Sequence, residues 1–246
     1  ANEVAVQADG KIVVAGLYYN GSTSVIVVLR HNVDGSLDSS FGSGGIVTTS
    51  IGSANDGGYS LAIQSDGKLV VGGTYNSINS GDFAIVRYNL NGSLDTSFGT
   101  NGTAITPIGS GNDQGRSVRI QADGKIVLGG WTNTGFYDHY ALVRYNTDGT
   151  LDTLFGTSGK VTTNVGDSGG RADSITIQPD GRIIIVGEAG ILGSNGDFGI
   201  IRYNADGSLD TTFDLASTLG GSVSTTENGS PVVLDSNVRA FDVELS

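Results

Sequence analysis

Hydrophobic and polar residues alternate in short runs along this chain, and the runs return in the same order four times. In the second unit, residues 59–64 (Tyr-Ser-Leu-Ala-Ile-Gln) place apolar and polar side chains in near alternation. A period of two predicts a half-buried β-strand. Because no segment keeps a helical period, we predict an all-β fold.

A Gln-x-Asp-Gly motif opens each unit at a step of 57 residues, at Gln7, Gln64, Gln121 and Gln178. Each motif is followed by an arginine on an apolar segment, and then by the run Gly-Ser/Thr-Leu-Asp-x-x-Phe. A period this long and regular indicates an array of identical supersecondary units. We therefore expect the shared chemistry to serve the scaffold, and function to lie where the units differ.

The second unit predicts four antiparallel strands, with a further β-prone run leading to the next unit. The predicted strands are 59–64, 69–73, 82–89 and 93–99, and the run is 103–108. Asp66-Gly67 predicts a two-residue hairpin turn, since both residues tolerate positive φ. Gly72 and Gly73 indicate close approach to other backbones. Four strands per unit with frequent turns are typical of a β-propeller blade.

We therefore predict a β-propeller-like array of four four-stranded blades of ~57 residues each over residues 1–221. The four blades either close into a ring or belong to a larger propeller, completed by further repeats or by a second copy of the chain. A parallel β-helix would need shorter rungs, and a β-sandwich would not need the same turn four times. The repeat is lost in the C-terminal tail, residues 222–246.

Three separated motifs keep register through the units and resemble the bacterial delta-60 repeat over residues 4–213. In the second unit they are Gln64-Ser-Asp-Gly-Lys-Leu-Val-Val, Asp82-Phe-Ala-Ile-Val-Arg-Tyr-Asn and Gly92-Ser-Leu-Asp-Thr-Ser-Phe-Gly. The resemblance implies a β-propeller in a large secreted or surface bacterial protein, and it implies no catalytic residues. The tail, from Thr226-Glu-Asn-Gly-Ser-Pro to Asp242-Val-Glu-Leu, resembles the opening strand of a bacterial cadherin-like domain. That resemblance implies a tandem adhesin-like stalk after the propeller.

Charge and composition exclude some classes of binding partner. The net charge is −12, and eight of the 13 basic residues occupy two repeat-fixed positions, so no basic stripe remains for nucleic acid or an anionic membrane surface. No apolar run approaches the length of a membrane span. The chain has no Cys, which leaves the compartment open. Because it begins at Ala1 without an initiating Met, we interpret it as a fragment or a processed product.

Calcium is the one cofactor that the motifs indicate. Oxygen side chains two residues apart around a glycine turn resemble calcium loops. The candidate ligands are Asn32, Asp34, Asp38, Asn146, Asp148, Asp152, Asn204, Asp206 and Asp210. The alternative is an Asp-Gly hairpin whose later Asp caps a backbone amide or pairs with the repeat arginine. Asn91 in the second unit favours the hairpin, because a ligand charge is lost there without other change.

The repeat arginines, Arg30, Arg87, Arg144 and Arg202, lie between apolar neighbours. A partly buried guanidinium needs a partner, and we predict that the Asp of the Leu-Asp motif provides it. The alternative is that the four arginines converge on an anion in a central channel.

The loops between the second and third strands vary most, and equivalent loops of blades emerge on one face. The aromatic residues in and beside these loops are our candidate ligand-binding residues: Tyr18, Tyr19, Tyr75, Trp131, Phe136, Tyr137 and His139. Aromatic rings near Asn and Asp suit a sugar or a peptide. The alternative is that Trp131 and Phe136 cover the edge of a blade.

From these features we predict a non-catalytic extracellular module that binds a glycan or a protein. The alternative is a purely structural subunit that assembles edge to edge into a filament or surface layer, or a homo-oligomer. A glycoside hydrolase comes third, because it needs two opposed carboxylates and the off-pattern acids Asp138 and Glu188 do not define such a pair. No Cys nucleophile and no Gly-x-Ser-x-Gly elbow occurs in the chain.

Overall fold

The computed structural model describes residues 1–77, 80–166, 168–190, 197–213, 233–235 and 238–239, and every regular element in these ranges is a β-strand. Consecutive strands pair antiparallel into four sheets that follow one another along the chain. Within the same ranges, no helix has the length and apolar character to cross a membrane. The prediction of an all-β array of blades is confirmed.

The four sheets are the four blades. Blade 1 contains β1 (Glu3–Val6), β2 (Ile12–Tyr19), β3 (Ser24–His31) and β4 (Ile46–Thr49). Blade 2 contains β5 (Gly57–Ile63), β6 (Leu69–Asn76), β7 (Gly81–Tyr88) and β8 (Thr103–Thr106). Blade 3 contains β9 (Asp113–Ile120), β10 (Ile126–Asn133), β11 (Asp138–Tyr145) and β12 (Lys160–Thr163). Blade 4 contains β13 (Gly170–Ile177), β14 (Ile183–Ala189) and β15 (Asp197–Tyr203).

The C-terminal tail contributes one small antiparallel pair, β16 (Val233–Asp235) and β17 (Val238–Arg239). Most of the stretch that resembles a cadherin-like domain, residues 222–246, lies outside the described residues. The predicted resemblance therefore stays a prediction.

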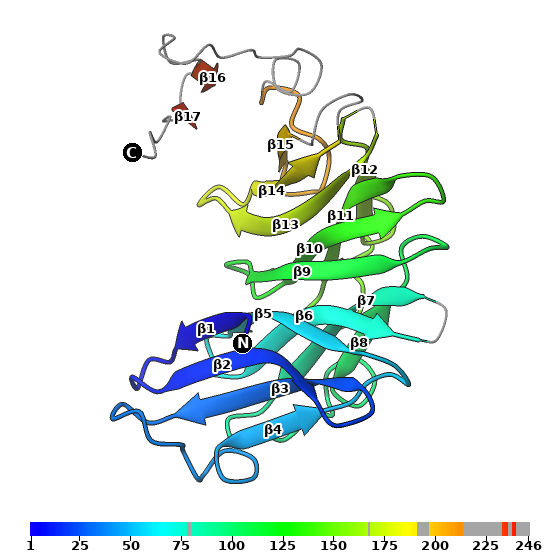
Figure 1. The fold of residues 1–246 in the computed structure, drawn as a ribbon. Coiled ribbons are helices and arrows are strands. Elements are labelled where there is room, and N and C mark those ends of the chain that lie inside the picture. The colour runs from blue at the N-terminus through cyan, green and yellow to red at the C-terminus, as the bar shows by residue number, and fades with distance from the viewer. Residues whose placement is uncertain (78–79, 167, 191–196, 214–232, 236–237, 240–246) are drawn as a thin grey trace, which may run out of the picture.

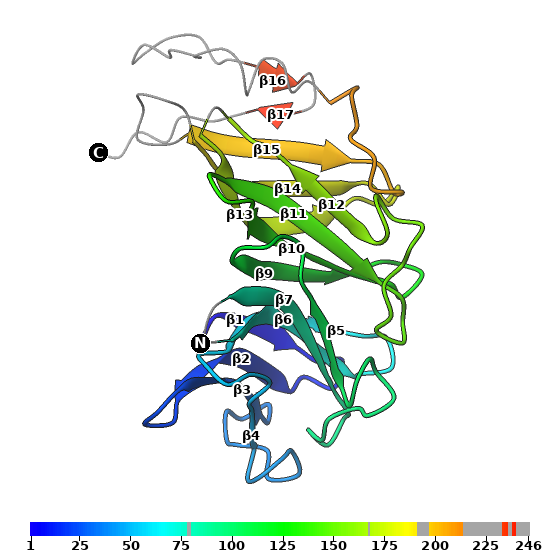
Figure 2. The ribbon, with the colours of Figure 1, turned by 90° about the vertical axis from the view of Figure 1, so that its right-hand side faces the viewer.

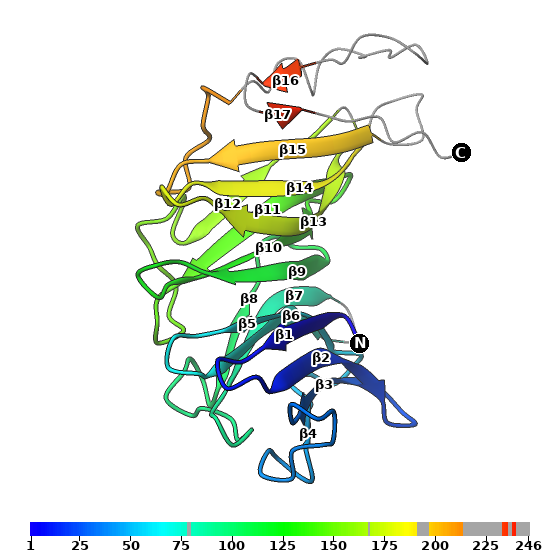
Figure 3. The same ribbon diagram turned by 90° about the vertical axis from the view of Figure 1, so that its left-hand side faces the viewer.

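The blades are stacked in chain order, with blade 1 at the bottom of Figure 1 and blade 4 above blade 3. Figures 2 and 3 show the same stack from its two sides. Contacts join β1 to β5, β5 to β9 and β9 to β13, so the first strands lie side by side along the inner edge. Blades 1 and 4 lie at opposite ends in all three views. The described blades thus form an open array, and not the closed four-bladed ring that was one of the two predicted arrangements.

Hydrophobic cores lie between successive blades. The core between blades 2 and 3 contains Phe83 and Ile85 from one sheet and Val118, Leu128 and Tyr145 from the other. Equivalent cores fill the other two interfaces. Burying each such side chain contributes about 1.5–3 kcal/mol, so the alternation seen in the sequence holds the blades to one another.

The Asp-Gly hairpins differ from the predicted two-residue turns. Pairing of β5 with β6 ends at Ile63 and Leu69, and the Gln64 amide donates to the Lys68 carbonyl at 2.9 Å. Gly67 has φ +84°, whereas Asp66 is not among the residues with positive φ. The loop is therefore a three-residue turn whose glycine alone takes the left-handed conformation. The Asp66 carboxylate accepts the Lys68 amide at 3.1 Å, which fixes the turn.

The predicted fourth strand of blade 2, 93–99, is wrong. Leu94 makes one isolated bridge to Tyr88, and the chain then turns. Asp95 causes the turn, because its carbonyl accepts the Phe98 amide at 3.0 Å and its carboxylate accepts the Ser97 amide at 3.1 Å. The fourth strand is β8, inside the β-prone run 103–108.

The predicted close approach at the paired glycines of β6 is confirmed. A Cβ on Gly72 would lie 2.8 Å from Leu128 Cδ1 of the next blade. A Cβ on Gly73 would lie 1.8 Å from the Gly57 carbonyl oxygen, beside the bulge at which β5 shifts register. A side chain at position 72 would push blades 2 and 3 apart, and one at position 73 would separate β6 from β5 within blade 2.

Candidate functional site

The residues that all blades share assemble into one cluster at the hairpin end of each sheet. In blade 2 the Arg87 Nε donates to Asp95 Oδ2 at 2.8 Å, and the guanidinium carbon lies 4.4 Å from the centre of the Phe98 ring. Lys68, from the Asp-Gly hairpin, donates to the same carboxylate oxygen at 2.8 Å. The predicted pairing of the buried arginine with the Leu-Asp aspartate is confirmed.

The cluster repeats with little change in the other blades. The Arg Nε to Asp Oδ2 distances are 2.7 Å for Arg30 and Asp38, 2.8 Å for Arg144 and Asp152, and 2.8 Å for Arg202 and Asp210. Each arginine stacks on the phenylalanine of its own blade, at 4.4–4.6 Å from the ring centre. The arginines are thus held one to a blade, and they do not converge on a common anion as the alternative interpretation required.

Hydrogen bonds make these aspartates strongly acidic. Donation from Lys11 and Ser40 holds the pKa of Asp38 well below its usual value. Donation from Thr212 lowers the pKa of Asp210 to about 2, against the opposing effect of burial. Charged donors that face a carboxylate favour its ionised form, so the Leu-Asp aspartate of each blade is ionised at neutral pH.

The candidate calcium ligands lie in and beside the second turn of each blade. Asp34 Oδ1 accepts the Ser36 amide at 3.0 Å and the Ser36 hydroxyl at 2.6 Å. Asn32 donates to the Ser36 hydroxyl at 3.0 Å. Asp38 faces the other way, into the arginine cluster.

The same two-sided arrangement recurs for the candidates of blades 3 and 4, Asn146, Asp148, Asp152, Asn204, Asp206 and Asp210. In each turn the first aspartate accepts protein donors at Oδ1, and the later aspartate accepts them at both carboxylate oxygens. Within the described part of the chain, no group of three acidic, His or Cys side chains is arranged to hold a metal ion. The role shown by the contacts is that of the hairpin, and calcium binding stays an untested prediction.

The aromatic candidates are divided between three blades. Tyr18 and Tyr19 are exposed at the end of β2 in blade 1, and Tyr75 is half-buried at the end of β6 in blade 2. Blade 3 brings the other four candidates, Trp131, Phe136, Tyr137 and His139, together in one hairpin between β10 and β11. Four of the seven candidates therefore belong to one hairpin of blade 3. Tyr75 lies in blade 2, and Tyr18 and Tyr19 lie in blade 1.

Trp131 is the buried base of this hairpin, only 6% exposed. The guanidinium of Arg171, from the first strand of blade 4, lies 4.7 Å from the centre of its ring. Cation–π contact of this kind contributes about 0.5–2 kcal/mol. Trp131 thus fits the interpretation that it covers the edge of the blade.

Phe136 behaves differently, since 94% of it is exposed at the tip of the loop. Asp138 braces the loop beneath it: Arg171 Nε donates to Asp138 Oδ2 at 2.6 Å, and Asn133 Nδ2 donates to Asp138 Oδ1 at 2.8 Å. The Asn133 side-chain oxygen in turn accepts the Gly135 amide at 2.9 Å. The loop therefore presents an exposed aromatic ring on a hydrogen-bonded support.

Sequence reasoning missed Arg171 and did not foresee that Asp138 supports this loop. The signal that was available is charge placement. Five basic residues lie outside the two repeat-fixed positions, and four of them belong to blade 3 or the start of blade 4: Arg116, Arg119, Lys160 and Arg171. Arg116 also stacks across a blade boundary, 4.8 Å from the centre of the Tyr59 ring. Off-pattern arginines mark the places where neighbouring blades make contacts of their own.

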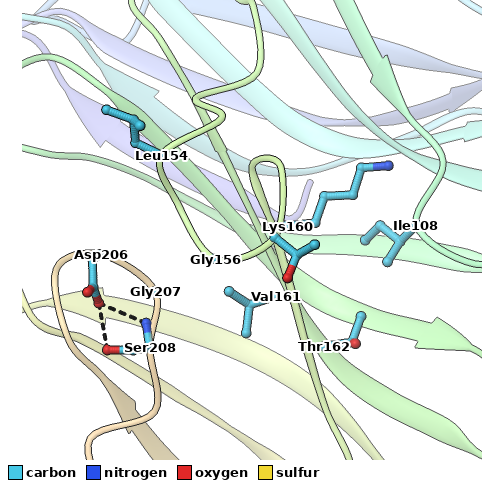
Figure 4. A pocket seen from close by; sticks show the side chains of 10 residues that line it. Ile108, Leu154, Gly156, Lys160, Val161, Thr162, Asp206, Gly207 and Ser208 are labelled. Carbon is cyan, nitrogen blue, oxygen red and sulfur yellow. Dashed lines mark hydrogen bonds between the residues drawn. The ribbon is translucent and has the colours of Figure 1, made fainter.

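Shallow grooves lie on the outer side of the stack between blades. The groove in Figure 4 has a volume of about 610 Å³ and lies between Lys160 on β12 and the Asp206 turn of blade 4. An equivalent groove of about 560 Å³ lies one blade earlier, beside Thr103 and the Gly149 turn. Because the groove repeats with the scaffold and its aspartate is engaged by Ser208, it is not a specialised site.

Stacked antiparallel blades, four-stranded in blades 1–3 and three-stranded in the described part of blade 4, that share one arginine–aspartate–phenylalanine cluster define a β-propeller repeat protein. The chain belongs to the family described as "Domain of unknown function (DUF5122) beta-propeller", whose matches are residues 7–41, 64–98, 121–155 and 178–213. Each matched segment begins at the hairpin glutamine and ends at the phenylalanine beneath the arginine. The family match thus coincides with the structural cluster.

Two solved structures are similar in fold. An alpha-L-arabinofuranosidase from Clostridium thermocellum has 8% identity and a TM-score of 0.41, with 84% of this chain and 68% of that chain covered. Extracellular domains 1–2 of Drosophila Semaphorin 1b have 11% identity and a TM-score of 0.39, with 82% of this chain and 40% of that chain covered. No curated protein matches the chain. Neither likeness bears on function at this level of identity.

Proposed function

We propose that this chain is a non-catalytic interaction module that binds a glycan or a protein through the loops at one edge of its blades. The shared arginines and aspartates are engaged with one another in every blade, which leaves the variable loops as the part free to specialise. Loops on a rigid scaffold are where binding residues concentrate in proteins generally.

The observation that carries the proposal is the hairpin of blade 3. Phe136 is almost fully exposed and Tyr137 is half-exposed beside it, on a loop whose base is fixed by Asp138 and Arg171. Exposed aromatic rings on a pre-organised support lose little conformational entropy on binding, and such residues dominate binding energy in many interfaces. Asn and Asp side chains nearby supply the directional hydrogen bonds that sugars and peptides need.

The proposed setting is a large secreted or surface protein of a bacterium. The support is the resemblance of the three repeat motifs to the delta-60 repeat, which is found in such proteins. An adhesive role follows from the same resemblance and from the cadherin-like pattern in residues 222–246.

The test is a binding screen on glycan and extracellular-protein arrays, followed by titration of each hit with two matched variants. Phe136→Ala removes the exposed ring of the blade 3 loop, and Leu154→Ala removes an exposed side chain from the groove at the other end of the same blade. We expect Phe136→Ala to weaken binding at least about tenfold, and Leu154→Ala to leave it unchanged.

Three results would count against the proposal. They are the absence of any hit, a hit that Phe136→Ala and Tyr137→Ala both leave intact, and turnover of aryl glycosides in a substrate panel. The last result would favour the glycoside hydrolase that the sequence left as a third candidate.

A further inference from the structure

The innermost strands of blades 2, 3 and 4 each contain a β-bulge at the same place. The register of β5, β9 and β13 shifts by one residue at Tyr59, Arg116 and Asp173, which lie 57 residues apart. A bulge leaves one residue unpaired and re-aims its side chain, and bulges are over-represented next to active sites. The bulge is thus a shared element of the scaffold, but the residue that it presents is different in each blade.

Two arginines of β9 reach across the inner edge of the stack to β5, which lies beside β9 (Figure 1). The guanidinium carbon of Arg116 lies 4.8 Å from the centre of the Tyr59 ring. Arg119 Nη1 lies 3.5 Å from Ser60 Oγ and donates to the carbonyl of Val118 at 2.7 Å. Because Tyr59 and Ser60 are consecutive residues, both positive side chains lie at one place on the boundary between blades 2 and 3.

Neither of these two arginines has an acidic partner. Every other arginine whose side chain the structure describes is paired with an aspartate. In addition, Arg116 Nε is buried and has no hydrogen-bond acceptor among the described residues. A buried charged donor without an acceptor costs free energy, and such an atom in a folded protein calls for an explanation. The scaffold leaves this donor unused, so it is available to a ligand.

The acidic side chains around the pair flank it without pairing with it. Ser60 Oγ donates to Glu3 Oε2 of blade 1 at 3.4 Å. Asp173, at the equivalent bulge of blade 4, is exposed. An anion bound by the two arginines would therefore have a carboxylate on either side of it. In a chain with a net charge of −12, this arrangement favours one small anionic group over an extended polyanion.

The fold of a blade does not require either arginine. The equivalent residues of the other blades are Asn2, Tyr59 and Asp173 for the first arginine, and Ala5, Ala62 and Thr176 for the second. Blade 2 forms the same bulge and the same four strands with Tyr59 and Ala62 at these positions. The two arginines are thus an addition made in blade 3 alone.

We propose that Arg116 and Arg119 together bind one oxyanion group, a phosphate, sulfate or carboxylate, at the inner edge between blades 2 and 3. A guanidinium presents N–H donors in a planar fork that matches the oxygens of such a group. The Tyr59 ring supports one face of the Arg116 guanidinium by a cation–π contact, which orients this side chain before the anion binds. The anion supplies the acceptor that Arg116 Nε lacks in the protein.

The test is a titration of the whole chain with inorganic phosphate, sulfate and glucuronate, each compared with sodium chloride at the same ionic strength. The Nε–H signals of Arg116 and Arg119 in isotope-labelled protein report binding at the site itself. We expect both signals to shift saturably with at least one probe, at a dissociation constant of about 1–10 mM, because a few charge-assisted hydrogen bonds hold a small ion. The probe that binds most tightly identifies the anionic group.

Three variants locate the site, with binding measured by the backbone amide signals of β5 and β9. Arg119→Ala introduces the residue that blade 2 has as Ala62, and Arg116→Gln keeps a polar side chain without the charge. We expect each of these two variants to weaken binding of the probe at least about tenfold. Lys160→Gln removes one positive charge from the groove on the outer side of the same blade, and it should leave binding unchanged.

Two outcomes overturn the proposal. The first is that no probe shifts the two arginine signals beyond the chloride control at concentrations up to about 50 mM. The second is binding that Arg116→Gln and Arg119→Ala leave intact, which would place the anion elsewhere. Thermal unfolding checks that each variant folds, and Arg119→Ala decides the question if Arg116→Gln does not fold. Neither outcome affects the proposed binding of a glycan or a protein, which depends on the loop of Phe136.

Discussion

Two arginines of this molecule have nearly the same partners and opposite surroundings. Arg87 donates to Asp95 at 2.8 Å and stacks on Phe98 at 4.4 Å, with 8% of its side chain exposed. Arg171 donates to Asp138 at 2.6 Å and stacks on Trp131 at 4.7 Å, with 57% of its side chain exposed. The first set recurs in every blade, whereas the second occurs once, at the opposite end of blade 3.

The difference shows what repetition conserves in this fold. At the hairpin end, all four blades keep the same arginine, aspartate and phenylalanine, and in blades 1–3 the arginine also donates to a carbonyl of the next blade. At the loop end, the equivalent positions Leu17, Thr74, Trp131 and Glu188 differ in size and charge.

The largest expected effect is on Arg87. Replacing it by Ala leaves the Asp95 carboxylate buried with Lys68 as its remaining charged partner, and removal of one member of a buried pair costs about 3–5 kcal/mol. Arg171→Ala is the matched control at the loop end, where an exposed pair contributes about 1 kcal/mol or less. Urea unfolding of both variants measures the two losses. Equal losses in the free energy of unfolding would show that the exposed arginine stabilises the protein as much as the buried one, contrary to this prediction.

The arginine–aspartate pair could be predicted from sequence because the reasoning needed only one fact about the fold. An arginine between apolar residues on a strand must find an acid, and the aspartate of the Leu-Asp motif follows it by 8 residues in each unit. The contribution of Lys68 was not predicted, because it depends on the hairpin folding back beside Asp95. Likewise, the run 93–99 looks like a strand until Asp95 is seen to cap the turn that ends it.

The loop end was harder to predict because its contacts cross between blades. Trp131 and Phe136 are both aromatic residues of one variable loop, and the sequence gives no ground for separating them. Arg171 makes the difference between the two rings. It comes from the next blade and covers Trp131, whereas Phe136 stays exposed. Periodicity locates the blades, but it does not show which off-pattern residues meet at their boundaries.

The second prediction concerns acid. The pKa of Asp38, Asp95 and Asp210 is lowered in the folded protein, that of Asp210 to about 2. The unfolded chain takes up protons first, near the ordinary Asp value of about 3.9, so stability is full above that pH and falls as pH decreases toward 2. Urea midpoints measured between neutral pH and pH 2 should show this loss.

A single-site variant sharpens the acid prediction. Asp210→Asn removes one ionisable group of a cluster, so it should lower stability at neutral pH and flatten the decline in acid. A variant with the same acid slope as the original chain would mean that the clusters are not the groups that titrate.

The third prediction tests a hydrogen bond between blades. The Tyr145 hydroxyl donates to Thr106 Oγ1 of blade 2 at 2.8 Å, and Tyr145 is buried. Tyr145→Phe should therefore cost about 1–2 kcal/mol, because it leaves the threonine hydroxyl without its donor. Tyr137→Phe at the exposed loop end should change the free energy of unfolding by less than about 0.5 kcal/mol. In a double variant, Thr106→Val should restore part of the loss, and no restoration would assign the loss to packing alone.

The smallest expected effect on stability is that of replacing Phe136. This variant gives the clearest contrast between the loop end and the hairpin end of a blade. Phe136→Ala removes a ring that is 94% exposed, so unfolding should shift by less than about 0.5 kcal/mol in the urea assay. The hairpin beneath it keeps its shape, since Asn133, Asp138 and Arg171 hold one another without the ring. A loss near that of Arg87→Ala would place Phe136 in the scaffold, and the loop end would then lack an element free to serve binding. Unchanged stability together with weakened ligand binding would instead show that the scaffold and the binding surface are carried by different residues at opposite ends of one blade.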